Sequence, residues 1–326
     1  MPVISPSTFP GPPFYQFNGH LQTVMPALFR RVKDVHYRRE RIDTPDGDFL
    51  DLDWLPKASS RLVILSHGLE GNTNRKYMKG MARAFSHNHW EVLAWNCRSC
   101  SGEMNRTPRL YHHGDTEDLG FVIDHALGKR AYDAVALVGF SMGGSMTLKY
   151  LGTRGNEAPS PIVCGIAFST PTDLEASVDT LELPGNGFYK RRFFNSLKAK
   201  LIIKERQFPG TVDSRRFNQV KSWKDFDEWF SAPMLGLGSA HEFYEQASAR
   251  NFMAGSAVPL LVVNAQNDPL LLPACTPVDL ARKHSQIYVE RPSTGGHVGF
   301  QTRAGYFWSE RRALEFAETA ASERLP

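Results

Sequence analysis

Short runs of consecutive apolar residues recur along the chain and alternate with stretches of helical periodicity. The runs are five to seven residues long and stand at 61–66, 91–96, 135–139, 162–168, 258–264 and 286–290. Uninterrupted apolar runs of this length are typical of strands that are buried on both faces of a parallel sheet. Helix-like stretches at 75–88, 117–129, 142–152 and 274–283 separate most of them. The pattern therefore predicts an α/β fold with helices on both faces of the sheet.

Two further strands and a long insertion complete this pattern. Residues 35–42 and 49–55 are strand-like, and the turn signal Pro45-Asp46-Gly47 between them favours a hairpin. The sequence thus predicts an eight-stranded, mostly parallel sheet, followed by a final helix at about 305–320.

The interval 174–251 breaks the alternation, because it is helix-like, aromatic and charged and is too long for an ordinary strand-to-helix connection. We expect it to form a helical lid over the carboxyl ends of the strands, where ligands bind.

The chain is accordingly predicted to have three parts. Residues 1–34 form an N-terminal arm that packs on the core. Residues 35–173 and 252–326 form the α/β core. Residues 174–251 form the lid, inserted after the sixth predicted strand.

Composition and charge narrow the class of protein. With 326 residues, 41% hydrophobic and 22% charged, the chain is long and apolar enough to bury a large core, which argues against disorder. A net charge of +4 is mild, and nucleic-acid binding is not expected, since only the stretch near 190 concentrates basic residues. Four cysteines are too few for a disulfide scaffold. The C-x-x-C pair of Cys97 and Cys100 could be redox-active or half of a zinc site, but no second pair with metal-ligand spacing accompanies it, and we favour a coincidental spacing. No metal site is predicted.

The first residues and the apolar runs also bear on location. The segment MPVISPSTFPGPPF has neither the basic region nor the apolar region of a signal peptide. No apolar run approaches the roughly 20 residues that a membrane-spanning helix needs. We therefore expect a cytoplasmic protein.

The strongest chemical signal is a G-x-S-x-G motif at 139–143, with Ser141 at its centre. It follows the apolar strand AVALV and opens the helical pattern MGGSMTLKYL, which is where a nucleophile elbow lies. Small residues on both sides of the serine permit a sharp turn that exposes the hydroxyl group. The motif therefore predicts Ser141 as a nucleophile.

A nucleophilic serine needs a general base and an acid that orients it, and in this fold they follow the serine in the order acid, then histidine. Asp268 follows the seventh predicted strand, and His297 follows the eighth in the sequence STGGH. We predict these two residues as the acid and the base. Asp173, at the end of the sixth predicted strand, remains the rival acid.

Backbone amides are the expected stabilisers of the oxyanion. The sequence HGLEG at 67–71 directly follows the third predicted strand, where this fold supplies one amide, and the second amide belongs to the residue after the nucleophile. These positions are Leu69 and Met142. We expect the side chain of His67 to pack and hydrogen-bond rather than to act as a base.

The sequence resembles the YheT-type branch of the α/β-hydrolases over nearly its whole length. That branch also includes eukaryotic lipid hydrolases and yeast alcohol acyltransferases. The resemblance rests on NGHLQT at 18–23, HGLEG at 67–71, Arg98 with the CSG that follows, YHHG at 111–114, GFSMGG at 139–144, FYEQASA at 243–249, NAQNDP at 264–269 and GGHVGF at 295–300. Two residues depart from the pattern, Ser99 in place of glycine and Asn267 in place of aspartate. Neither is a predicted catalytic group.

The predicted triad and oxyanion amides indicate hydrolysis of a carboxylic ester through an acyl-enzyme, and no metal or organic cofactor is implied. The resemblance implies medium-chain acyl esters or lipids as the substrates. The substrate would be a small-molecule acyl ester, and no protein partner is inferred. Two alternatives stay open. One is acyl transfer to an alcohol by the same triad, and the other is a ligand receptor without catalytic activity.

Three features are left undecided by the sequence. His113 and Asp118 form an H-x-x-x-x-D pattern like that of acyltransferases, although residues 115–118 also suit a helix N-terminus, which we favour. His20 and Gln22 either hold the N-terminal arm to the core, the role we favour, or border the substrate pocket. Basic residues between 188 and 206 surround an apolar face (Tyr189, Phe193, Leu197 and Leu201), which suggests either core packing, which we favour, or weak contact with an anionic membrane.

Overall fold

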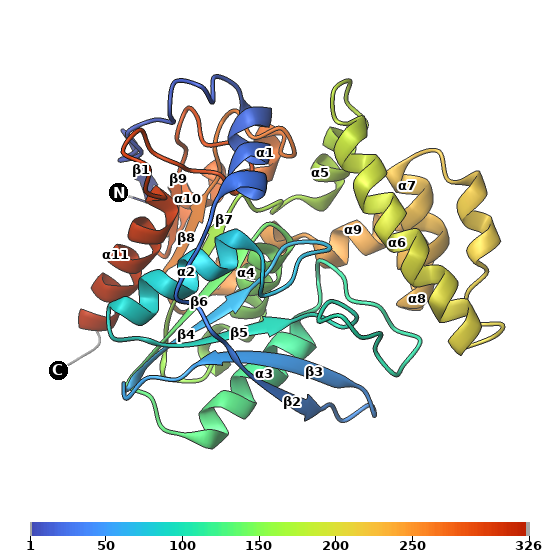
Figure 1. The fold of residues 1–326 in the computed structure, drawn as a ribbon, viewed down its shortest axis with the longest axis horizontal. Helices are drawn as coiled ribbons and strands as arrows, with labels where there is room; N and C mark the ends of the chain where they lie inside the picture. The colour runs from blue at the N-terminus through green and yellow to red at the C-terminus, as the bar shows by residue number, and fades with distance from the viewer. Residues whose placement is uncertain (1, 324–326) are drawn as a thin grey trace.

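The computed structural model describes residues 2–323 and is built on one mixed sheet (Figure 1). Its strand order is β1-β9-β8-β7-β6-β4-β5-β3-β2. The strands are β1 (Val3–Ile4), β2 (Arg38–Asp43), β3 (Phe49–Leu55), β4 (Arg61–Ser66), β5 (Glu91–Asn96), β6 (Ala134–Phe140), β7 (Ile162–Phe168), β8 (Leu260–Val263) and β9 (Ile287–Glu290). β3 pairs antiparallel with β2 and β5, and the other pairings are parallel. The predicted fold class is confirmed.

The predicted number of strands needs a correction, because the sheet formed by residues 2–323 has nine strands rather than eight. The additional strand is β1, which lies in the predicted N-terminal arm and pairs in parallel with β9 through Val3 and Val289. A strand of two residues is too short to show any periodicity. It was therefore invisible in the pattern of the sequence.

Successive residues of the central strands face two separate hydrophobic clusters, as expected for side chains that alternate across a sheet. In β4, Leu62 and Ile64 belong to one cluster, and Val63 and Leu65 belong to the other. The first cluster includes residues of α3 (Thr116–Lys129), α4 (Met142–Arg154) and α10 (Val278–Lys283). The second includes residues of α2 (Lys76–His87) and α11 (Trp308–Ser322). Both faces of the sheet are thus covered by helices.

A helical segment between β7 and β8 stands beside the core (Figure 1). Its helices are α5 (Leu174–Leu181), α6 (Gly187–Gln207), α7 (Trp223–Phe226), α8 (Ala232–Met234) and α9 (Ala240–Ala247). Most of its buried apolar residues form a third cluster, which includes Leu201, Trp223 and Phe230. We propose, on this arrangement, that the segment acts as the lid, and we keep the predicted division into arm, core and lid.

The basic residues of α6 do not all face solvent. Lys204 is fully buried, and its Nζ donates hydrogen bonds to the carbonyl oxygens of Asn105 and Thr107 over 2.8 and 2.5 Å. Burial lowers the pKa of Lys204 to about 8. The apolar face of the helix is also buried, at Tyr189, Leu197 and Leu201. The amphipathic pattern of α6 is therefore used for packing, and the membrane contact stays a prediction.

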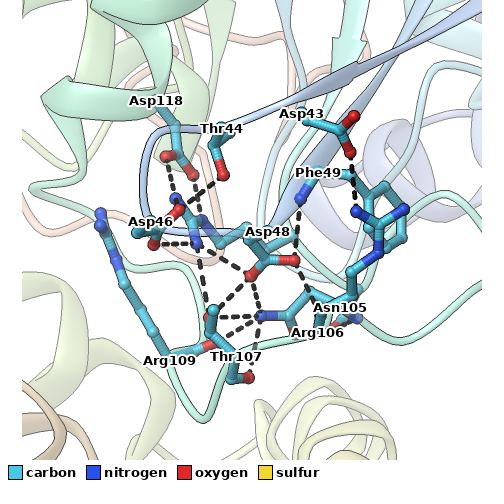
Figure 2. Close-up of polar contacts among 12 residues, drawn as sticks. Asp43, Thr44, Asp46, Asp48, Phe49, Asn105, Arg106, Thr107, Arg109 and Asp118 are labelled. Atoms are coloured by element: carbon cyan, nitrogen blue, oxygen red, sulfur yellow. Dashed lines mark hydrogen bonds and ion pairs between the residues drawn. The ribbon is translucent and has the colours of Figure 1, made fainter.

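The loop that receives Lys204 belongs to a buried polar network whose members include Asp46, Asp48, Asn105 and Asp118 (Figure 2). The Arg98 guanidinium lies at its centre. The Arg98 guanidinium contacts the carboxylates of Asp46, Asp48 and Asp118 over 2.6 to 2.9 Å. Asn105 also donates to Asp48 over 2.6 Å. The network thereby joins the β2–β3 turn, the loop after β5 and the start of α3 into one unit. Through the contact of Lys204 with this loop, the unit also anchors α6.

In the part of the chain that the structure describes, no helix is both long enough and apolar enough to span a membrane.

Candidate active site

Ser141 lies in a sharp turn between β6 and α4. Its backbone has the left-handed φ of 53°, which is unusual for a residue with a side chain. The neighbouring glycines are required by close backbone contacts, because a Cβ atom on Gly139 would lie 2.2 Å from the Gly143 oxygen. A Cβ atom on Gly143 would lie 2.3 Å from the Ser66 oxygen. The geometry is that of a nucleophile elbow.

The structure brings the three predicted residues Ser141, His297 and Asp268 together. His297 Nε2 lies 3.1 Å from Ser141 Oγ, and His297 Nδ1 lies 2.9 and 3.1 Å from the two carboxylate oxygens of Asp268. The Asp268 side chain is fully buried, whereas the His297 side chain keeps 13% of its surface exposed. A carboxylate at Nδ1 fixes the proton there and leaves Nε2 free to accept the proton of the hydroxyl group.

The rival acid, Asp173, is occupied elsewhere. Its Oδ1 accepts a hydrogen bond from the Ala176 amide over 3.1 Å and so caps α5. Its other oxygen lies 2.8 Å from Arg250. The geometry therefore favours Asp268 as the acid of the site.

The two predicted oxyanion amides are both available. Around Leu69, the amide of Gly68 donates to Tyr77, that of Glu70 to Tyr111, and that of Gly71 to the Gly68 oxygen. Within residues 2–323, nothing accepts a hydrogen bond from the Leu69 amide. The amide of Met142 is the first of α4, and amides in the first turn of a helix have no partner inside it. Both groups remain predictions for the oxyanion hole.

Glu70 anchors this loop to the lid. Lys200 of α6 lies 2.7 Å from its carboxylate, and Ser196 of α6 and Tyr111 also donate to it. Burial favours a higher pKa for Glu70, but the charge and hydrogen bonds of Lys200 hold this pKa below its ordinary value. This role of Glu70 was not predicted from the sequence, because its partners on α6 are more than 120 residues away in the chain.

His67 has the structural role that the sequence suggested. It is fully buried, and its Nε2 accepts a hydrogen bond from the Cys97 amide over 3.1 Å. Its Nδ1 lies 2.8 Å from the Gly68 oxygen. Burial lowers the pKa of His67 to about 4, so the ring is neutral at pH 7. A neutral ring with both nitrogens engaged is suited to shaping the loop.

Helix α1 (Gly19–Phe29) holds the acid loop and the histidine loop in place. Gln22 is buried, and its Oε1 accepts hydrogen bonds from Asn267 Nδ2 over 2.9 Å and from the Gly295 amide over 2.7 Å. Thr23 Oγ1 accepts from the His297 amide over 2.8 Å. Gln22 thus has the structural role that we favoured for it. The roles of Thr23 and Asn267 were not predicted from the sequence.

The backbone of α1 also comes close to the backbone of both loops. A Cβ atom on Gly19 would lie 1.9 Å from the Asn267 oxygen, and one on Gly296 would lie 2.7 Å from the Gly19 oxygen. Gly296 also has a φ of 61°, and its amide donates to Asn267 Oδ1 over 3.1 Å. The glycine of the NGHLQT segment and those before His297 therefore permit the contact between α1 and the catalytic loops.

The H-x-x-x-x-D pattern does not form a second acid–base pair. Both carboxylate oxygens of Asp118 accept from Arg98, over 2.7 and 2.8 Å. Helix α3 begins at Thr116, as the cap interpretation predicted, but the Asp115 side chain forms no capping bond and instead pairs with Arg109 over 2.6 Å.

His20 is exposed and lies 3.2 Å from the hydroxyl of Tyr189 on α6.

Cys97 and Cys100 are free, buried thiols. Burial raises the pKa of Cys100 to about 11, so this thiol is protonated at pH 7. Within residues 2–323, no group of three or more histidine, cysteine, aspartate or glutamate side chains is arranged to hold a metal ion.

A cavity of about 380 Å³ opens onto Ser141 and His297. Its walls come from α1, the loop 68–71, the start of α2 and the first turns of α6. Several wall residues are apolar, among them Leu28, Leu69, Phe193, Leu270 and Phe307. A mainly apolar pocket with a few polar groups is typical of small-molecule sites.

Comparisons with known proteins identify the family of the chain. Residues 61–304 match the family model described as the alpha/beta hydrolase fold. YheT of Escherichia coli (strain K12) is 34% identical over 291 residues, which cover 87% of this chain and 84% of that protein. Phospholipase ABHD3 of Mus musculus is 28% identical, covering 92% of this chain and 74% of its own length.

Among solved structures, the esterase Pf2001 of Pyrococcus furiosus has a TM-score of 0.58 at 17% identity, covering 91% of this chain and 97% of that one. At this identity the likeness shows the fold alone. The match of the family model over most of the chain, together with the similarity to YheT, places the protein among the α/β-hydrolases. The chain therefore belongs to the α/β-hydrolase family, in its YheT branch, and is a hydrolase.

Proposed function

We propose that the protein is a serine carboxylic ester hydrolase that acts through an acyl-enzyme. One observation carries the proposal: His297 lies between Ser141 and Asp268, with Nε2 at 3.1 Å from the hydroxyl oxygen and Nδ1 at 2.9 Å from the buried carboxylate. A serine is a weak nucleophile until a base accepts its proton. This arrangement supplies such a base and fixes its tautomer.

The proposed reaction has two steps. Ser141 Oγ attacks the ester carbonyl while His297 Nε2 accepts its proton, and the amides of Leu69 and Met142 stabilise the oxyanion. His297 then gives the proton to the leaving alcohol, and an ester of Ser141 remains. Water, activated by the same histidine, attacks this ester and releases the acid.

The cavity and the relatives support an apolar acyl group. Leu69, Phe193 and Leu270 present apolar surface beside the candidate nucleophile. The relatives include proteins named phospholipase ABHD3 and, in Saccharomyces cerevisiae, monoacylglycerol lipase. We therefore propose medium-chain acyl esters or lipids as the substrates.

A series of p-nitrophenyl esters from acetate to laurate tests this proposal. We expect hydrolysis with the highest kcat/KM at intermediate chain length, and a loss of about 10⁴ to 10⁶ in kcat for Ser141→Ala, the scale seen when a triad member is removed. Absence of hydrolysis at every chain length, with the protein folded, would contradict the proposal.

Acyl transfer to an alcohol is the second candidate, because a relative that is 25% identical is named medium-chain fatty acid ethyl ester synthase/esterase 2. The same acyl-enzyme serves both reactions, which differ only in whether water or an alcohol attacks it. Product analysis with ethanol present separates them. An excess of ethyl ester over free acid would favour transfer.

A further inference from the structure

The wall of the catalytic cavity carries an excess of positive charge. Four basic side chains line it (Arg30, Arg75, Lys76 and Arg192), against a single acidic one, Glu70. The carboxylate of Glu70 is already paired with Lys200, which is outside the cavity wall. Charged groups of one sign in a low-dielectric cleft focus the field on what enters it. The cavity is therefore both apolar and positively charged.

Only one of the four cations is neutralised. Arg30 pairs with Glu310 and lies over the ring of Phe307, 3.6 Å from its centre. Arg75 donates to the Glu70 carbonyl oxygen over 2.5 Å, and Lys76 donates to that of Leu28. Neither contact removes a charge.

Arg192 is the cation with the fewest constraints. It is exposed on the second turn of α6, next to Phe193 in the cavity wall. Among residues 2–323, no carboxylate lies within ion-pair distance of Arg75, Lys76 or Arg192. Three cations, two at the start of α2 and one on α6, thus border the same cavity without a counter-ion among the described residues.

We propose that this basic wall, formed by Arg75, Lys76 and Arg192, binds an anionic group of the ester substrate. The proposal rests on the proposed esterase function and names its substrate class, an acyl ester that also carries a phosphate or carboxylate. Arg and Lys form charge-assisted hydrogen bonds with such groups. The apolar part of the cavity holds the acyl chain, and the basic wall holds the charge.

The anionic group has two sources, and matched substrates distinguish them. On the alcohol side, monooctanoylglycerol is compared with monooctanoylglycerol 3-phosphate, which has the same ester bond and acyl chain. On the acyl side, p-nitrophenyl nonanoate is compared with p-nitrophenyl hydrogen azelate. We expect at least one pair to show a kcat/KM about tenfold higher for the anionic member at low salt, and a smaller ratio at high salt. Equal values within both pairs would overturn the proposal.

Arg191 offers a matched control, because it neighbours Arg192 on α6, is exposed and does not line the cavity. Arg192→Gln should lower the ratio of anionic to neutral kcat/KM by about tenfold, the scale of one charge-assisted hydrogen bond. Arg191→Gln should leave this ratio unchanged. Equal effects of the two substitutions would show a general charge effect and contradict a site.

Calorimetric titration separates the failure of this proposal from that of the esterase function. Hexyl phosphate should bind to the wild-type protein, 1-hexanol should bind more weakly, and Arg192→Gln or Lys76→Gln should weaken the binding of hexyl phosphate about tenfold. Binding of hexyl phosphate without hydrolysis of any ester would keep the anion site and refute the esterase function. Hydrolysis of the neutral esters without binding of hexyl phosphate would keep the esterase function and refute the anion site.

Discussion

The backbone amide of His297 donates a hydrogen bond to the side-chain oxygen of Thr23 over 2.8 Å, although the two residues are 274 positions apart in the chain. This bond, with those of Gln22 to the Asn267 side chain and the Gly295 amide, joins an N-terminal helix to both loops of the candidate triad. A loop carrying a general base must hold it within a fraction of an ångström of its working position. We infer that α1 provides part of that precision.

Removing the acceptor on Thr23 tests this inference. Thr23→Val leaves the His297 amide without its partner, so we expect kcat to fall about tenfold with a much smaller change in KM. Thr23→Ser keeps the hydroxyl group and should restore most of the activity. Steady-state kinetics on a p-nitrophenyl ester gives kcat and KM for both variants. A loss that is equal for the two variants would point to packing and not to the hydrogen bond.

The choice between Asp268 and Asp173 can be tested in the same assay. Without the carboxylate at Nδ1, His297 adopts the wrong tautomer, so Asp268→Asn should lower kcat by about 10⁴ while the fold stays intact. Asp173→Asn keeps a side-chain oxygen that can cap α5 and removes only the ion pair with Arg250, so it should change stability by no more than about 1 kcal/mol with little effect on kcat. The opposite pattern would move the acid to the end of β7.

The contact between the lid and the oxyanion loop predicts a third effect. Lys200→Met leaves the buried carboxylate of Glu70 without its counter-charge, so the loop that carries Leu69 should lose order. We expect kcat to fall about tenfold and the free energy of unfolding to fall by about 3 kcal/mol.

Lys198→Met is the matched control for Lys200. Lys198 lies on the same helix, donates a hydrogen bond to the side chain of Asn218 and lies over the ring of Phe217. Lys198→Met should change neither kcat nor the free energy of unfolding appreciably. Denaturant unfolding and steady-state kinetics of both variants provide the comparison. Full activity of Lys200→Met would show that the lid contact does not order the loop.

Burial of His67 predicts a dependence of stability on pH. Its pKa falls from an ordinary value of 6.5 to about 4 in the folded protein, so the unfolded state binds more protons between these pH values. The contribution of His67 to stability is therefore fully present above pH 6.5 and decreases by about 1.4 kcal/mol per pH unit as the pH falls towards 4.

Two buried acids act in the opposite direction, because burial raises the pKa values of Asp115 and Asp227 to about 7. A difference measurement removes their effect. Urea unfolding of the wild-type protein and of His67→Gln should give free energies whose pH slopes differ by about one proton between pH 6.5 and 4. Parallel slopes would mean that His67 titrates normally.

The parts of the molecule that depend on local sequence were predictable. The elbow at Ser141 needs glycines at fixed offsets from the serine, and the β8 and β9 strands end just before Asp268 and His297. Each of these features is visible within about ten residues. The structure accordingly brings together the three residues that the motifs singled out.

The parts that depend on contacts between distant segments were not predictable from a single sequence. The bond from Thr23 to His297 and the contacts of Glu70 with α6 join residues more than 120 positions apart. The amphipathic pattern of α6, with one apolar face, was predicted correctly. The pattern did not show that Lys200 and Lys204 point inward, because a buried lysine is indistinguishable in sequence from a solvated one.

Labelling with a fluorophosphonate tests the central claim most directly, because the probe reacts with a serine only where a base activates it. The wild-type protein should be labelled stoichiometrically, peptide mass spectrometry should find the label on Ser141, and Ser141→Ala should remain unlabelled although folded. Robust labelling of Ser141→Ala, or a label on another residue of the wild-type protein, would contradict the assignment of Ser141 as the nucleophile.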